Sequence, residues 1–156
     1  MNTLLLPLSN FNGSELDNHL EYIRKTRNNS KHYMTRFCGE INSEMQKSWY
    51  SNISKKIHPY IFIVGEHGVV FYPVGYGTIN IEGDSAMVTG VISQSERGKG
   101  FGRKLFSALI EESKKMAQKV SLEVLETNTT GIRLYESLGF IETNRDHDVI
   151  TMELKK

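Results

Sequence analysis

Apolar residues recur every three or four positions in four parts of the chain, and this spacing is typical of helices that bury one face. In the first part Ser14 is the candidate N-cap, and in the second it is Asn42 or Ser43. The stripe that holds Trp49 predicts that this side chain packs in the core. The predicted helices span residues 14–27, 42–53, 100–118 and 129–138.

Runs of β-branched and aromatic residues bounded by glycine or turn residues predict strands between these helices. The run over 69–81 holds a proline and two glycines, which predicts a bend or bulge. Residues 66–68 and 82–84 read as turns. The order of elements predicts an α+β fold. The predicted strands cover residues 60–64, 69–81, 86–93, 120–125, 140–141 and 149–154.

Length and charge narrow the class of protein. The 156 residues favour a single domain over 1–156, at roughly 150 residues per domain. The 19 basic and 18 acidic residues leave a net charge of +1, which argues against nucleic acid or a membrane surface as partner. Cys38 is the only cysteine, and the first residues lack the features of a signal peptide, so we expect a cytoplasmic protein. The five histidines lack metal-ligand spacing, so no metal is expected.

A glycine-rich loop precedes the third predicted helix. Gly98, Gly100 and Gly102 alternate with Lys99, Phe101 and Arg103 at its start. A helix N-terminus offers unpaired N–H groups and partial positive charge, and glycines let an anion approach the backbone closely. A Walker loop needs Ser or Thr after Gly98-Lys99, where Gly100 stands. A dinucleotide fingerprint needs glycine after Gly102, where Arg103 stands. The loop therefore predicts another kind of phosphate ligand.

A second motif follows about thirty residues later and completes a resemblance. Asn128 precedes Leu134-Tyr135, which is followed by Leu138-Gly139-Phe140. Together with Arg97, Gly100 and Gly102, these residues match the two motifs of the GNAT N-acetyltransferase superfamily, whose acetyl-CoA loop reads Arg/Gln-x-x-Gly-x-Gly/Ala. The chain resembles that superfamily closely over 60–156 and loosely over 1–59. The sequence departs from the pattern at Gly131, where alanine is commoner.

The resemblance implies a fold and a co-substrate. The fold is a central, mostly antiparallel mixed sheet with helices on both faces, in which strands 86–93 and 120–125 splay apart to admit acetyl-CoA. The pantetheine arm would follow the backbone of Gly90, Val91 and Ile92, and Asn128 would also contact this arm. The pyrophosphate would lie on the backbone amides of the loop that follows Arg97, namely those of Gly98, Lys99, Gly100, Phe101, Gly102 and Arg103.

The implied reaction is transfer of an acetyl group from acetyl-CoA to a primary amine by direct attack. Tyr135 would protonate the departing thiolate, and a tyrosine near its ordinary pKa of about 10 is protonated at neutral pH. Alternation along strand 120–125 puts Glu123 on the face opposite Leu122 and Val124, where it would act as general base. His58, Glu82 and Asp84 stay as further candidates for that base.

The acceptor is less constrained by the motifs. We expect residues 1–59 to form a helical acceptor-side region and 60–156 to form the sheet and the acetyl-CoA site. Residues 27–50 loosely resemble acetyltransferases of nucleotide-linked amino sugars and, about as loosely, relatives that act on protein N-termini. Of the two we expect a small-molecule amine, such as a sugar amine. The alternatives are the N-terminus of a peptide or protein, as in the ribosomal-protein branch, and a sensor that binds acetyl-CoA without turnover. A monomer and a homodimer are both compatible with the sequence.

Overall fold

The computed structural model describes residues 2–36, 39–65 and 71–155. Its strands are β1 (Asn2–Pro7), β2 (Ile57–Gly65), β3 (Tyr72–Glu82), β4 (Ser85–Ile92), β5 (Lys119–Leu125), β6 (Phe140–Asp146) and β7 (Val149–Leu154). Its helices are α1 (Gly13–Asn29), α2 (Ser43–Ser51), α3 (Phe101–Met116) and α4 (Thr129–Ser137). Single-turn 3-10 helices lie at Leu8–Asn10, Lys31–Tyr33 and Gln94–Glu96.

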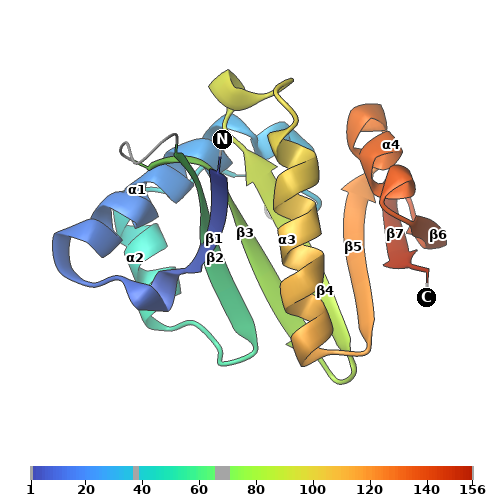
Figure 1. Ribbon diagram of the computed structural model, residues 1–156, viewed down its shortest axis with the longest axis horizontal. Helices are drawn as coiled ribbons and strands as arrows, with labels where there is room; N and C mark the ends of the chain where they lie inside the picture. The colour runs from blue at the N-terminus through green and yellow to red at the C-terminus, as the bar shows by residue number, and fades with distance from the viewer. Residues whose placement is uncertain (1, 37–38, 66–70, 156) are drawn as a thin grey trace.

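The strands form one sheet in the order β1-β2-β3-β4-β5-β7-β6. Only β4 and β5 pair in parallel, and the other neighbours are antiparallel. Helices α1 and α2 cover one face, and α3 and α4 cover the other (Figure 1). The α+β fold with a mostly antiparallel mixed sheet and helices on both faces is confirmed.

Each face of the sheet has its own apolar cluster. The larger cluster lies under α3, whose predicted stripe is confirmed because Leu105 and Leu109 are fully buried with Phe106 beside them. The smaller cluster lies under α1, where Leu20 and Ile23 are buried as the helical spacing predicted. Burial of these stripes, rather than helix propensity, holds the helices in place, since short helices are marginal alone.

The structure corrects three sequence-based expectations. Strand β1 was not predicted, because its leucine run lacks alternation and β-branched residues; pairing with the buried strand β2 supplies its structure. Helix α1 begins at Gly13 after Asn12 rather than being capped by Ser14. The expected core position of Trp49 is wrong. Its side chain is 38% exposed, and α2 buries Gln46 instead.

Several turn predictions are confirmed. The β2–β3 register shifts between Phe62 and Ile63, opposite the Pro-Val-Gly segment in which a bulge was expected. Gly83 has φ +60° in the β3–β4 hairpin, and Gly139 has φ +103° just after α4. Asn42 caps α2 by accepting a hydrogen bond from the Met45 N–H at 2.8 Å. The expected turn over 66–68 and Cys38 lie outside the described residues.

The parallel pair β4–β5 is short. Its ladder runs only from Ser85 opposite Lys119 to Met87 opposite Ser121. Strand β4 continues to Ile92 and β5 to Leu125, so the two strands diverge over their last residues, as the resemblance implied. The gap opens at the carboxyl ends of the parallel strands, where ligands bind in many α/β sheets.

Gly77 allows α3 to lie close to β3. A Cβ at this position would stand 2.9 Å from a Leu109 methyl group and 3.0 Å from the Thr89 carbonyl oxygen. We expect Gly77→Val to lower the unfolding free energy in urea by about 1–3 kcal/mol, because the helix must move away. Thr78→Val, on the opposite face of the same strand, is the control. Equal midpoints for the two variants would contradict this account of the packing.

Candidate active site

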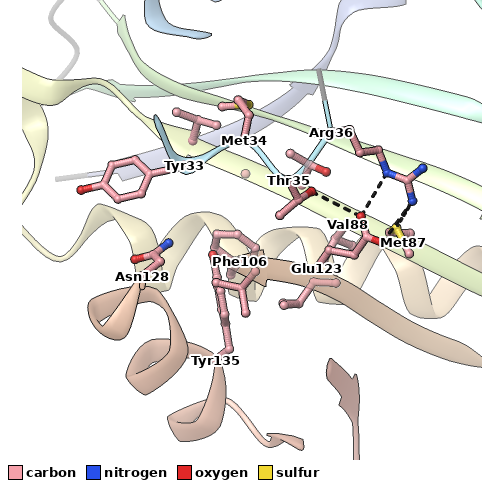
Figure 2. Close-up of a pocket in the computed structure, with 15 residues that line it drawn as sticks. Tyr33, Met34, Thr35, Arg36, Met87, Val88, Phe106, Glu123, Asn128 and Tyr135 are labelled. Atoms are coloured by element: carbon pink, nitrogen blue, oxygen red, sulfur yellow. Dashed lines mark hydrogen bonds and ion pairs between the residues drawn. The ribbon is translucent and has the colours of Figure 1, made fainter. Parts of the chain in front are cut away.

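A cavity of about 200 Å³ occupies the gap between β4 and β5. Its walls are residues 87–91 of β4 and 122–124 of β5, and the segment 33–36 covers it. Three more side chains complete the lining, those of Phe106, Asn128 and Tyr135 (Figure 2). Residues from six separate parts of the chain therefore meet at the point where the parallel strands diverge.

Glu123 faces the α1 side of the sheet. Its neighbours Leu122 and Val124 belong to the core under α3, so the predicted alternation along β5 is confirmed. The carboxylate accepts hydrogen bonds from Arg36 Nε at 3.0 Å and Arg36 Nη2 at 3.2 Å. It also accepts one from the Thr35 hydroxyl at 3.3 Å. The Glu123 side chain is 20% exposed, whereas that of Arg36 is 74% exposed at the mouth.

Tyr135 enters the cavity from α4. Its ring packs against Phe106, with centroids 4.8 Å apart, and against Phe140 at 6.2 Å. These apolar surroundings disfavour the phenolate, and burial raises the pKa of Tyr135 to about 12. The hydroxyl therefore keeps its proton at neutral pH with a wider margin than an exposed tyrosine would have.

Asn128 lies at the start of α4 and lines the cavity. Its side-chain oxygen accepts a hydrogen bond from the Gly131 N–H at 3.0 Å and so caps the helix. A Cβ on Gly131 would stand 2.7 Å from the Asn128 side-chain nitrogen. Glycine at position 131 is therefore the residue that this orientation of Asn128 requires.

The glycine-rich loop has the conformation that its sequence predicts. Gly98 and Gly100 have φ values of +77° and +84°, and Gly100 precedes the first residue of α3. A Cβ at either glycine would have no atom of the described residues within 4 Å. Gly100 is the N-cap of α3 and offers no side chain to accept hydrogen bonds from the first N–H groups of the helix.

The basic side chains of the loop have protein partners. Arg97 donates to the Ile92 carbonyl at 3.2 Å and to the Ser30 hydroxyl at 2.7 Å, and it stacks on Tyr33. Lys99 pairs with Glu96 at 2.9 Å, and Arg103 donates to the Ser137 hydroxyl at 2.6 Å. The ring of Phe101 is buried in the core, so only its backbone faces the loop.

The predicted site residues thus gather in two adjoining places. Gly90, Val91, Glu123, Asn128 and Tyr135 line the cavity. The loop residues 97–103 lie between the end of β4 and the start of α3.

The other candidate bases lie elsewhere. His58 is on β2, while Glu82 and Asp84 flank the β3–β4 hairpin turn, and none of them lines the cavity. Glu82 is 3.9 Å from Lys56. Of the cavity-lining residues that the structure describes, Glu123 is the only carboxylate.

The comparisons with known proteins agree with this geometry. The model of the acetyltransferase (GNAT) family matches residues 24–140. The chain belongs to the GNAT acetyltransferase family.

This GNAT chain is 30% identical over 113 residues to the L-methionine sulfoximine/L-methionine sulfone acetyltransferase of Salmonella typhimurium strain LT2. That match covers 66% of this chain and 62% of the relative's length.

Two solved structures share the fold. A domain from Methanocaldococcus jannaschii aligns with a TM-score of 0.83 and 21% identity, over 98% of this chain and 97% of that one. Spermidine N-acetyltransferase from Vibrio cholerae, in complex with CoA and spermine, aligns with a TM-score of 0.78 and 20% identity, over 97% and 94%.

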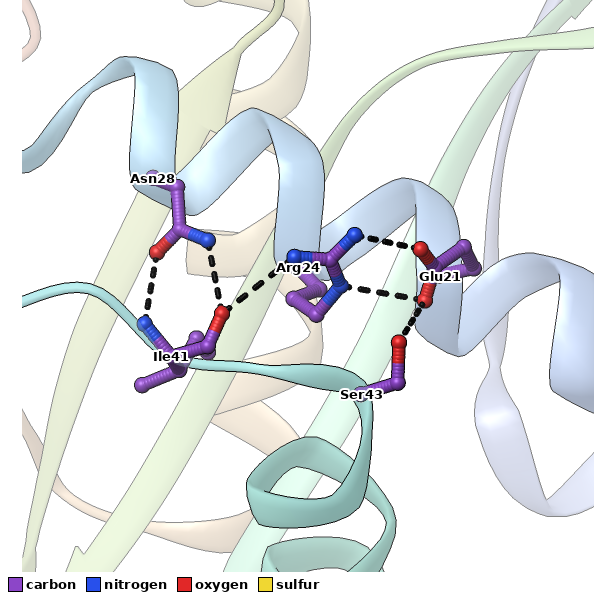
Figure 3. Close-up of polar contacts among 5 residues, drawn as sticks. All are labelled: Glu21, Arg24, Asn28, Ile41 and Ser43. Atoms are coloured by element: carbon purple, nitrogen blue, oxygen red, sulfur yellow. Dashed lines mark hydrogen bonds and ion pairs between the residues drawn. The ribbon is translucent and has the colours of Figure 1, made fainter.

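The segment 33–36 is the part of this GNAT site that the sequence did not reveal. Arg36 lies 87 positions before its partner Glu123, in a stretch without periodicity, so no spacing connects the two. The segment begins shortly after α1, and the chain contacts that helix again at Ile41, which Asn28 holds. The Asn28 side chain accepts from the Ile41 N–H at 3.0 Å and donates to the Ile41 carbonyl at 2.8 Å (Figure 3).

A second set of contacts holds the same connection. Arg24 donates to the Ile41 carbonyl at 3.3 Å and to Glu21, and Ser43 donates to Glu21 at 3.0 Å (Figure 3). The hydrogen bond from Arg24 lowers the pKa of Glu21 to about 2. Ile41 and Ser43, which follow the covering segment in the chain, are thus tied to α1.

Within residues 2–36, 39–65 and 71–155, no helix combines the length and apolar character that a bilayer crossing needs. No three His, Cys, Asp or Glu side chains there come together as a metal site would require.

Proposed function

We propose that this GNAT enzyme transfers an acetyl group from acetyl-CoA to the primary amine of a small molecule. The observation that carries the proposal is the gap between β4 and β5, into which Tyr135 and Glu123 both project from different elements (Figure 2). A related fold in Vibrio cholerae has been solved with CoA in place. This supports acetyl-CoA as the co-substrate.

Acetyl-CoA would bind along the α3 side of the gap. Its pyrophosphate would accept hydrogen bonds from the backbone amides of residues 98–103, where the start of α3 adds partial positive charge. Its pantetheine arm would pair with the backbone of Gly90, Val91 and Ile92, which β5 does not pair with. Asn128 lines the same space and would contact this arm. The thioester would then lie beside Tyr135.

The reaction balances with the groups that line the cavity. The acceptor ammonium gives one proton to the Glu123 carboxylate, and the free amine attacks the thioester carbonyl carbon. A C–N bond forms and the C–S bond breaks, while the thiolate takes the proton of the Tyr135 hydroxyl. The second proton leaves the acylated nitrogen and restores Tyr135, and Glu123 releases the first proton to solvent. Alignment of the two reactants contributes several kcal/mol to lowering the barrier, and each proton transfer adds about 10²–10⁴-fold.

The cavity favours a small acceptor over a long peptide because segment 33–36 covers it. The amino sugar expected from the sequence is one candidate. The amino-acid derivatives named for the Salmonella relative are another. Release of free thiol from acetyl-CoA in the presence of each class of amine distinguishes these acceptors from one another and from protein N-termini.

Tyr135→Phe tests the acid. With any acceptor that is turned over, kcat should fall at least about tenfold, equivalent to about 1.4 kcal/mol, because the thiolate must leave unprotonated. Acetyl-CoA affinity should stay unchanged, since the ring keeps its packing on Phe106. The wild-type kcat should show no alkaline loss of this acid below about pH 10, because burial raises the pKa of Tyr135 to about 12.

The control for this variant is Tyr60→Phe, a buried tyrosine of the same core that does not line the cavity. Turnover by Tyr135→Phe at the Tyr60→Phe rate would remove Tyr135 from the role of acid.

Gly100→Ala and Gly83→Ala form a matched pair for the cofactor loop. Both glycines have positive φ with no described atom near a new Cβ, so both variants pay a similar strain of about 1–2 kcal/mol. Only Gly100 lies where the pyrophosphate would bind. We expect isothermal titration to show at least about tenfold weaker acetyl-CoA binding for Gly100→Ala and wild-type binding for Gly83→Ala. Equal affinities would contradict the loop assignment.

Glu123→Gln tests the base through turnover at neutral pH. Because glutamine cannot accept the proton of the acceptor ammonium, the variant should turn over at least about 10²-fold more slowly than the wild type, while acetyl-CoA affinity stays unchanged. Wild-type turnover by this variant would show that another group is the base.

A further inference from the structure

We propose that the acceptor is an α-amino acid, whose ammonium binds Glu123 and whose carboxylate binds Arg36. The inference rests on the proposed function and narrows it to a substrate class. It starts from the ion pair that closes the acceptor side of the cavity (Figure 2).

The cavity lining carries one charge of each sign. Among the described residues that line it, Arg36 and Glu123 are the only charged ones. Arg36 comes from the covering segment and faces Glu123 on β5. The contact is bidentate, with Arg36 Nε and Nη2 on separate carboxylate oxygens. Such paired N–H···O bonds are the geometry in which a guanidinium recognises a carboxylate.

An incoming amine must compete with this contact. Glu123 is fixed on a strand and held by Thr35, whereas the exposed Arg36 side chain can swing aside. An ammonium that takes its place on Glu123 leaves the guanidinium at the mouth without its carboxylate. A ligand with a carboxylate next to its ammonium restores that contact, so one ion pair is exchanged for two.

Other amine classes fit these charges less well. A polyamine carries several positive charges. The described lining of the cavity holds a single carboxylate to bind them, and Arg36 repels the others. An amine without a neighbouring anion breaks the ion pair between Arg36 and Glu123 and supplies no carboxylate in its place. The size of the cavity, about 200 Å³ shared with the thioester, also suits a compact zwitterion.

The test compares each acceptor with its own carboxamide. The panel is the common L-amino acids and L-methionine sulfone, each paired with its carboxamide, together with spermidine, glucosamine and a tripeptide amide. We expect at least one amino acid to show kcat/KM about 100-fold above that of its carboxamide. The preference is telling because an amine loses its proton more readily beside a neutral amide than beside a carboxylate.

Variants then assign the preference to Arg36. Arg36→Gln should lower the ratio of kcat/KM for acid over carboxamide at least about tenfold, mainly through KM for the acid, and Arg36→Lys should restore part of it. Arg145→Gln removes another exposed, ion-paired arginine far from the cavity lining and should leave the ratio unchanged.

The outcomes separate the two proposals. The amino-acid inference would be overturned if spermidine, glucosamine, the tripeptide amide or the carboxamides showed kcat/KM as high as the amino acids. The acetyltransfer proposal would then stay intact. A preference for acids that persists in Arg36→Gln would overturn the role of Arg36. Absence of thiol release with every amine would overturn the proposed function and this inference with it.

Discussion

The divergence of β4 and β5 is the constraint on which the rest of the site depends. A parallel pair normally continues to the ends of its strands, because unpaired N–H and C=O groups away from water are costly. Here the ladder stops after three pairs of residues, at Met87 and Ser121. The last residues of β4 are therefore held by β3 on one side only, and the other side is open to an extended ligand. Such an arrangement suits an arm that pairs as a strand does.

The fold must hold this gap open without help from the missing pairs. Phe106 does so from α3: a Cβ on Gly90 would stand 3.0 Å from its ring, so glycine lets the helix lie against the diverging strand. Tyr135 packs against the same ring. The aromatic side chains that line the gap thus join α3 to α4, and the burial of Tyr135 among them raises its pKa.

Local motifs could be predicted from the sequence because each reflects a short-range requirement. The alternate glycines mark positive φ at a helix start, Gly139 marks a helix end, and Leu105 with Leu109 marks a buried stripe. The order of elements and the resemblance then placed Tyr135, Asn128 and Glu123 near one another. What could not be predicted depends on distant pairing: β1 takes its structure from β2, and Trp49 is exposed because α2 turns another face to the sheet. In both cases the structure of the segment depends on residues outside it.

Arg36 shows why the acceptor side is the harder half of such an enzyme to infer. The pyrophosphate and the thioester are the same in every acetyl-CoA enzyme, so backbone geometry and a few residues close together in the sequence are enough to form their site. The proposed acceptor side pairs Glu123 on a strand with Arg36, 87 positions earlier in the chain. Asn28 and Arg24 hold Ile41, which follows this segment, against α1. Charge complementarity across such a contact is a property of the folded chain. It follows that the chemistry of this protein can be inferred from its motifs, while its choice of amine must be inferred from which charges the fold places opposite one another.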